Sequence, residues 1–125
     1  MREIKFRVWN NLAKEMIHTI QDIEFCDGGI IIHHGVGIAP HEELVHFACP
    51  DCILLEYTGL RDKNGVEIYE GDIVRYLSKD VQRIVEWDDE EGGFALKRSN
   101  NTWAEFYRVT RMEVIGNIYE NSELL

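Results

Sequence analysis

The stretch YTGLRDKNGVEIYEGDIV, residues 57–74, decides the fold of this 125-residue chain. It holds acidic residues, glycines and tyrosines at a density that is found in active sites, and the same residue types also build tight turns. The segment Asp62-Lys63-Asn64-Gly65 lies between two apolar runs, which is typical of a β-hairpin connection. Whether these residues serve catalysis or architecture therefore depends on how the hairpin is paired.

Two pairings of this hairpin compete. A two-residue Asn-Gly loop would place Asp62 opposite Glu67, and like charges that face each other across a hairpin are destabilising. A type I turn that begins at Asp62, with Gly65 in the left-handed bulge position, pairs Arg61 with Glu67 instead. We predict the second register because its cross-strand pairs are all compatible.

The second register also sets the surroundings of the turn. It places Gly59 opposite Tyr69, whose ring can cover the bare glycine backbone. Glu70-Gly71-Asp72 then redirects the chain into an apolar pair, as in the Gly-Asp entry to a strand of SH3-like barrels. Turn capping, cross-strand pairing and solubility account for these residues, so we predict no catalytic residue among them. The predicted structural motif comprises Gly59, Asp62, Asn64, Gly65, Tyr69, Gly71 and Asp72.

Alternation of apolar and polar residues continues outward from this stretch and predicts further strands. In the first strand, Phe6 and Val8 are expected on one face and Arg7 and Trp9 on the other, as in a half-buried strand. Segment 35–52 is expected to be a loop with a short helix over EELVHF, residues 42–47, and segment 102–109 fits a helical face as well as an irregular strand. The predicted strands are 4–9, 16–20, 22–25, 29–34, 53–60, 66–70, 72–77, 81–87, 93–97 and 112–119.

Many short strands with glycine-rich turns and no long capped helix predict a mainly β protein. We expect N-terminal β-hairpins and a loop over residues 1–52, followed by a small SH3-like barrel over residues 53–125, with at most short helices. A chain of 125 residues is long enough for one domain with a substantial core.

Charge and composition bound the function classes. The net charge is −10, spread evenly along the chain without a cluster of basic residues, so the backbone of a nucleic acid would be repelled. The chain has no apolar run long enough to cross a bilayer and begins without a signal peptide. Three cysteines in such a chain indicate reduced thiols in the cytoplasm. We therefore expect a cytoplasmic protein with neither membrane nor nucleic acid as its partner.

Segment 33–52 contains the best candidate for a metal site. Cys49 and Cys52 have the spacing of a zinc-binding pair, and His41 and His46 could complete a tetrahedron. Only one half of this pattern has standard ligand spacing, so we predict no stoichiometric zinc and no other cofactor. The chain also lacks a G-x-S-x-G elbow and a glycine-rich strand-to-helix junction, and we predict no catalytic residues.

Four blocks of the sequence carry a resemblance to a known family. MREIKFRVWN, YTGLRDKNGVEIYEGDIV, EWDDEEGGFAL and VIGNIYENSELL together are similar to the YopX family of small proteins encoded by phages and prophages, mostly of Gram-positive bacteria. The blocks cover about half of the chain in the family's order, whereas segment 33–52 matches nothing in the family's pattern. The resemblance implies a self-assembling protein and supplies neither a biochemical activity nor catalytic residues.

These observations favour a non-enzymatic accessory protein of a phage or prophage that works by protein–protein contact and forms a homo-oligomer. The C-terminal block is expected to take part, because Leu124 and Leu125 would otherwise be exposed. Three alternatives stay open: an acidic decoy of a host nucleic-acid-binding protein, a nucleic-acid-binding β-barrel module with aromatic stacking, and a metal-dependent enzyme.

Overall fold

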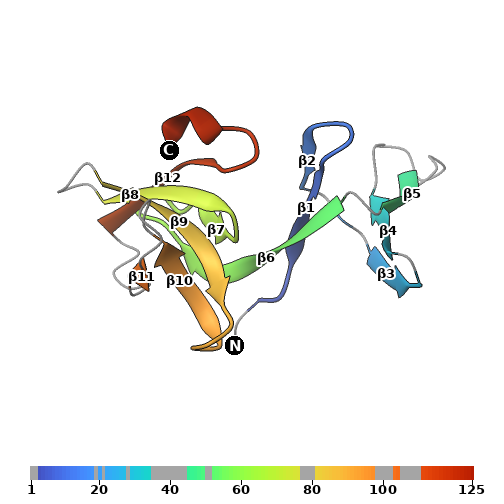
Figure 1. The fold of residues 1–125 in the computed structure, drawn as a ribbon, viewed down its shortest axis with the longest axis horizontal. Helices are drawn as coiled ribbons and strands as arrows, with labels where there is room; N and C mark the ends of the chain where they lie inside the picture. Colours follow the sequence, from blue (N-terminus) through green and yellow to red (C-terminus); the bar gives the residue numbers. More distant parts are fainter. Residues whose placement is uncertain are drawn as a thin grey trace. The chain divides into compact units, whose positions relative to one another are not determined.

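The computed structural model of this chain is built of short β-strands (Figure 1). The structure describes residues 3–18, 20, 22–27, 29–34, 45–49, 52–76, 81–97, 103–104 and 111–125. Its strands are β1 (Phe6–Asn10), β2 (Glu15–Ile17), β3 (Asp22–Cys26), β4 (Gly29–His34), β5 (Val45–Cys49), β6 (Cys52–Arg61), β7 (Glu67–Tyr69), β8 (Asp72–Tyr76), β9 (Val81–Asp88), β10 (Gly93–Lys97), β11 (Trp103–Ala104) and β12 (Met112–Asn117). A 3-10 helix follows at Ser122–Leu124.

The chain divides into two compact units. The N-terminal unit comprises Phe6–Leu55, and the C-terminal unit comprises Met1–Lys5 with Glu56–Leu125. Strand β6 therefore begins in one unit and ends in the other. The first five residues belong to the C-terminal unit. Within the described residues, no helix is both long and apolar enough to cross a membrane.

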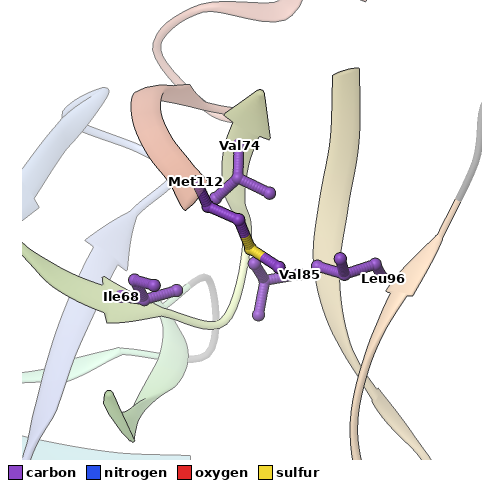
Figure 2. Close-up of a cluster of buried hydrophobic side chains, with 5 residues drawn as sticks. All are labelled: Ile68, Val74, Val85, Leu96 and Met112. Carbon is purple, nitrogen blue, oxygen red and sulfur yellow. The ribbon is translucent and has the colours of Figure 1, made fainter. Parts of the chain in front are cut away.

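In the C-terminal unit, antiparallel strands form a five-stranded sheet in the order β11-β10-β9-β8-β12, which curls into a half-barrel (Figure 1). Alternate residues of its strands point inward, and Val85 of β9 lies directly opposite Leu96 of β10. These two side chains pack with Ile68, Val74 and Met112 into a cluster that is fully buried (Figure 2). The predicted mainly β fold is confirmed.

The N-terminal unit contains a three-stranded antiparallel sheet in the order β3-β4-β5 and the β1–β2 hairpin. Its core is a cluster of Val8, Ile17 and Ile32, and Val8 lies opposite Ile17 in the hairpin. The side chain of Asn10 closes the hairpin turn, because its Oδ1 accepts hydrogen bonds from the backbone N–H groups of residues 12 and 13 at 3.1 Å each.

Two expectations about this unit were wrong. The predicted helix over residues 42–47 is replaced, from residue 45, by strand β5, which pairs with β4 and places Phe47 opposite Ile32. Backbone pairing with a neighbouring strand outweighs a weak local preference for a helical turn. Strand β1 is buried on both faces, since Arg7, Val8 and Trp9 are all buried. It is also an inner strand of its sheet, between β2 and β6.

Candidate functional site

The centre of the stretch 57–74 is the carboxylate of Asp62, which is only 6% exposed. Its Oδ1 accepts hydrogen bonds from the backbone N–H groups of Asn64 at 2.8 Å and Val66 at 2.9 Å. Its Oδ2 accepts a third, at 2.9 Å, from the N–H of Val114 in β12. A buried carboxylate that accepts hydrogen bonds from backbone N–H groups is a structural anchor, because these hydrogen bonds stabilise its negative charge in that position. Asp62 thus joins the turn to a strand 52 residues further along the chain.

The turn itself has the predicted geometry. Gly65 has a φ of +81°, in the left-handed region that favours glycine. Its N–H donates to the Asp62 carbonyl at 3.0 Å, and the Asp62 N–H donates to the Val66 carbonyl at 2.8 Å. Arg61 pairs with Glu67 in the sheet register. The predicted turn and this pairing are confirmed.

The predicted pairing of Gly59 with Tyr69 is wrong. Tyr57 lies opposite Tyr69, because β6 carries extra residues in a bulge. Gly59 adopts a φ of +87° within that bulge, and the buried hydroxyl of Thr58 donates to the Ile68 carbonyl at 2.7 Å. The side-chain hydrogen bond takes the place of a ladder hydrogen bond, so the bulge leaves this carbonyl satisfied.

The turn at Gly71-Asp72 anchors the next strand. Gly71 has a φ of +88°, its N–H donates to the Val85 carbonyl at 2.8 Å, and its carbonyl accepts from the Ile118 N–H at 3.0 Å. Asp72 is 1% exposed, and its Oδ2 accepts a hydrogen bond from the Tyr69 N–H at 2.8 Å. The two buried aspartates of the stretch therefore hold backbone at turns, and neither presents a solvent-accessible carboxylate.

Aromatic and charged groups attach the N-terminal segment to this stretch. The rings of Tyr57 and Tyr69 lie 5.4 Å apart, and the Nζ of Lys5 lies 5.1 Å from the centre of the Tyr57 ring. Lys5 also forms an ion pair with Glu67. The hydrogen bond to Glu67 and the charges of Glu67 and Glu3 raise the pKa of Lys5, against a smaller opposing effect of desolvation. This cation–π and ion-pair contact is a structural tie between residues 3–5 and the sheet.

A further turn, which was not predicted from the sequence, lies at residues 116–125. Asn117 Oδ1 accepts from the N–H groups of Tyr119 at 3.0 Å and Glu120 at 2.9 Å. Asn121 Oδ1 accepts from the Asn117 N–H at 3.1 Å, and the Asn121 N–H donates to the Asn117 carbonyl at 2.9 Å. A Cβ at Gly116 would lie 2.6 Å from Asn121 Oδ1, so this position requires glycine. The Gly-Asn-x-x-x-Asn spacing, with two turn-forming asparagines, was the available signal.

The carboxyl group of Glu70 has a raised pKa. Desolvation by partial burial raises the pKa of Glu70, and the negative charges of Glu56 and Glu86 raise it further, while a hydrogen bond from the backbone N–H of Glu56 lowers it. Like charges close together favour one protonated carboxyl group. Within the described part of the chain, no three His, Cys, Asp or Glu side chains are placed to hold a metal ion.

The zinc candidates fall mostly outside the described residues. His41 lies in an undescribed segment, and the structure describes the backbone of His46 and Cys49 in β5 without their side chains. Cys52 is disulfide-bonded. The expected reduced thiols are therefore wrong for Cys52. A sulfur atom in a disulfide is not a thiolate, so Cys52 is no zinc ligand in this state.

The acidic segment between β9 and β10 forms a turn at the surface. The N–H of Gly92 donates to the Asp88 carbonyl at 2.8 Å, and Asp88 Oδ1 accepts from the Glu90 N–H at 3.0 Å. The rings of Trp87 and Phe94 pack edge to face across the hairpin, with their centroids 5.1 Å apart. Glu90 and its acidic neighbours Asp89 and Glu91 are exposed.

Comparisons with known proteins place this fold. A search of solved structures found protein EF1440 from Enterococcus faecalis, with a TM-score of 0.72 and 29% identity over 100% of this chain and 99% of that one. Protein yopX from Bacillus subtilis matches with a TM-score of 0.60 and 18% identity over 100% of this chain and 97% of that one, a likeness of fold alone. Comparison with curated proteins found no match. The model of the YopX protein family matches residues 5–125. The chain therefore belongs to the YopX family, as its four sequence blocks indicated.

Proposed function

We propose that this YopX-family protein is a non-enzymatic accessory protein, encoded by a phage or prophage, that acts through protein–protein contact. We further propose that it self-associates through its C-terminal turn, residues 117–125. Family membership supports the phage origin. The absence of an enzymatic role is supported by the functions of the acidic residues in the stretch 57–74, because Asp62 and Asp72 are buried and bonded to backbone donors.

The observation that carries the proposed contact is the exposure of Leu125 on an ordered support. Leu125 as a residue is 57% exposed, although the residues before it are fixed by the Asn117–Asn121 hydrogen bonds. The backbone continues this order, since the Leu124 N–H donates to the Asn121 carbonyl at 3.0 Å and the Leu125 N–H to the Ser122 carbonyl at 3.2 Å. An apolar side chain that is held in place and left in water can be buried in a contact at little further entropic cost.

The size of the effect is modest for one side chain. Completing the burial of one leucine contributes about 1–2 kcal/mol. A two-fold symmetric contact buries the same leucine from each of the two copies, for about 2–4 kcal/mol in total. The net charge of −10 on each copy opposes association. Added salt should therefore strengthen self-association, because it screens this repulsion while leaving apolar burial intact.

Light scattering coupled to size-exclusion chromatography, at low and high salt, tests the proposal. The full chain should give a mass above that of one 14.6 kDa chain, with the larger species favoured by salt. Leu125→Ser and a chain ending at Ser122 should shift the mass toward the monomer. Leu12→Ser is the matched control, because Leu12 is 81% exposed in the N-terminal unit and should leave the mass unchanged. A monomeric full chain at every salt concentration would contradict the proposal, as would equal effects of Leu125→Ser and Leu12→Ser.

A further inference from the structure

The inner face of the β9–β10 hairpin continues beyond the core of the C-terminal unit. Val85 lies opposite Leu96 inside the buried cluster, and Trp87 lies opposite Phe94 one step nearer the turn. Side chains two residues apart on a strand point to the same face of the sheet, so both pairs share the inner face. Phe94 is half-buried and Trp87 is 41% exposed. The apolar face therefore extends into water at the turn end of the hairpin.

The geometry of this aromatic pair leaves the indole ring open to a further contact. The planes of the two rings stand at 84° to each other, with the centroids 5.1 Å apart. In such a perpendicular pair, Phe94 can cover at most one face of the Trp87 ring. The face of an indole carries negative partial charge, and it attracts a cation more strongly than any other aromatic side chain.

Free carboxylates lie directly beside this pair, in the turn of the same hairpin. The exposed ones belong to Asp89, Glu90 and Glu91. Among the interactions of the described residues, no ion pair or hydrogen bond uses these three carboxylates. The turn is nevertheless ordered, because Asp88 accepts the N–H groups of Glu90 and Gly92. Residues 86–94 also contain no lysine or arginine, so a cation can reach the carboxylates without displacing a partner.

We propose that the turn end of the β9–β10 hairpin is a docking surface for an arginine-containing basic segment of another protein. The planar guanidinium group of arginine stacks on the exposed ring of Trp87 and donates hydrogen bonds to the carboxylates of Asp89 and Glu90. An aromatic face next to unpaired carboxylates matches both properties of this side chain. The net charge of −10 attracts the same class of partner.

The charge of the surface argues against other occupants. A two-fold symmetric contact between two copies would bring their acidic turns together, and a nucleic acid or an anionic lipid surface would be repelled. The hairpin turn also lies at the other end of the C-terminal unit from residues 117–125 (Figure 1). This surface gives the protein–protein contact proposed above a class of partner, and it does not depend on the proposed self-association.

Binding of a fluorescent synthetic peptide to the full chain, measured by fluorescence anisotropy at low salt, tests the proposal. In the probe peptide arginine alternates with serine, and the two control peptides carry lysine or glutamine in place of every arginine. The arginine peptide should bind about tenfold or more tightly than the glutamine peptide and about threefold or more tightly than the lysine peptide. Equal binding of the arginine and lysine peptides would overturn the proposal, because it would show attraction by charge alone.

Substitutions of the aromatic ring test the stacking contact. Trp87→Phe keeps a ring at this position, whereas Trp87→Leu keeps only an apolar side chain. Trp87→Leu should bind the arginine peptide about threefold or more weakly than Trp87→Phe, with thermal unfolding to check that both variants are folded. Equal affinities of the two variants would refute stacking on Trp87.

A pair of double substitutions with the same change in net charge tests the carboxylates. Asp89→Asn combined with Glu90→Gln should weaken binding of the arginine peptide by about threefold or more. The matched control combines Asp27→Asn with Glu15→Gln, two exposed acidic residues of the N-terminal unit. Equal effects of the two double substitutions would overturn the assignment of binding to this hairpin.

Nuclear magnetic resonance on the unmodified chain provides a check that needs no folded variant of Trp87. The arginine peptide should shift the indole N–H resonance of Trp87 and the amide resonances of residues 89–91, and unchanged resonances at both would overturn the proposal. Leu125→Ser should bind the peptide as the unmodified chain does, and loss of binding in this variant would contradict a site on the hairpin. Added salt should weaken peptide binding, opposite to its effect on self-association, so failure of one proposal is distinguishable from failure of the other.

Discussion

Asp62→Asn tests the structural role of the most connected side chain in the stretch that decides the fold. The substitution keeps the shape of the side chain and replaces one carboxylate oxygen by an NH₂ group. The remaining oxygen can serve the N–H groups of Asn64 and Val66 or the N–H of Val114, but not both sides. On the side of the new NH₂ group, this amide donor then faces a backbone N–H donor. At 6% exposure no bulk water compensates this loss.

The expected cost follows from that geometry. A buried hydrogen bond to a charged acceptor contributes about 1.5–3 kcal/mol, and the unpaired donor adds a desolvation penalty, so Asp62→Asn should lower the free energy of unfolding by about 2–4 kcal/mol. For a chain of 125 residues this corresponds to a fall in Tm of about 6–16 °C. Asp62→Ala should cost more, since all three backbone donors lose their acceptor.

Urea unfolding, followed by circular dichroism, measures this cost. Asp88→Asn is the matched control, because Asp88 Oδ1 accepts one backbone N–H, from Glu90, at an exposed turn. Water can replace that hydrogen bond, so the control should cost about 1 kcal/mol or less. Equal costs for Asp62→Asn and Asp88→Asn, with unchanged m values, would refute the anchoring role of Asp62 and reopen the catalytic interpretation.

Three more substitutions test other parts of the C-terminal unit. Gly65→Val should destabilise the protein by about 1–3 kcal/mol in urea unfolding, because valine is strained at a φ of +81°, whereas Gly93→Val, at a glycine without positive φ, should not. Gly116→Ala should cost about 1–3 kcal/mol through overlap with Asn121, and a double-mutant cycle with Asn121→Gly should show positive coupling; additive costs would contradict the close approach. The pKa of Glu70 is raised in the folded state, so the stabilising contribution of this residue is complete at acidic pH and is lost as the pH rises through that pKa. Glu70→Gln should therefore gain stability relative to the unmodified chain between about pH 4 and pH 7. A pH-independent difference in stability between the two chains would contradict this.

The local features of the fold could be predicted from the sequence. The turn at 62–65 was predicted in its type and in its glycine position, because a few neighbouring residues fix both the allowed φ and the side-chain caps. The pairing of Arg61 with Glu67 followed, since opposed like charges excluded the rival register. The mainly β class followed from alternation along many short segments, and the four sequence blocks indicated the family.

Features that depend on distant partners were not predictable in this way. The sequence marks Asp62 as a turn residue, but its hydrogen bond to Val114 exists only because β12 is brought beside the turn. Segment 45–49 forms strand β5 because it pairs with the edge of β4. The bulge at Gly59 shifts the pairing of β6 with β7 away from the register that turn chemistry alone predicts. Local conformational preferences are set by sterics within a few residues, whereas the burial and pairing of a strand depend on which segments the whole chain folds against it.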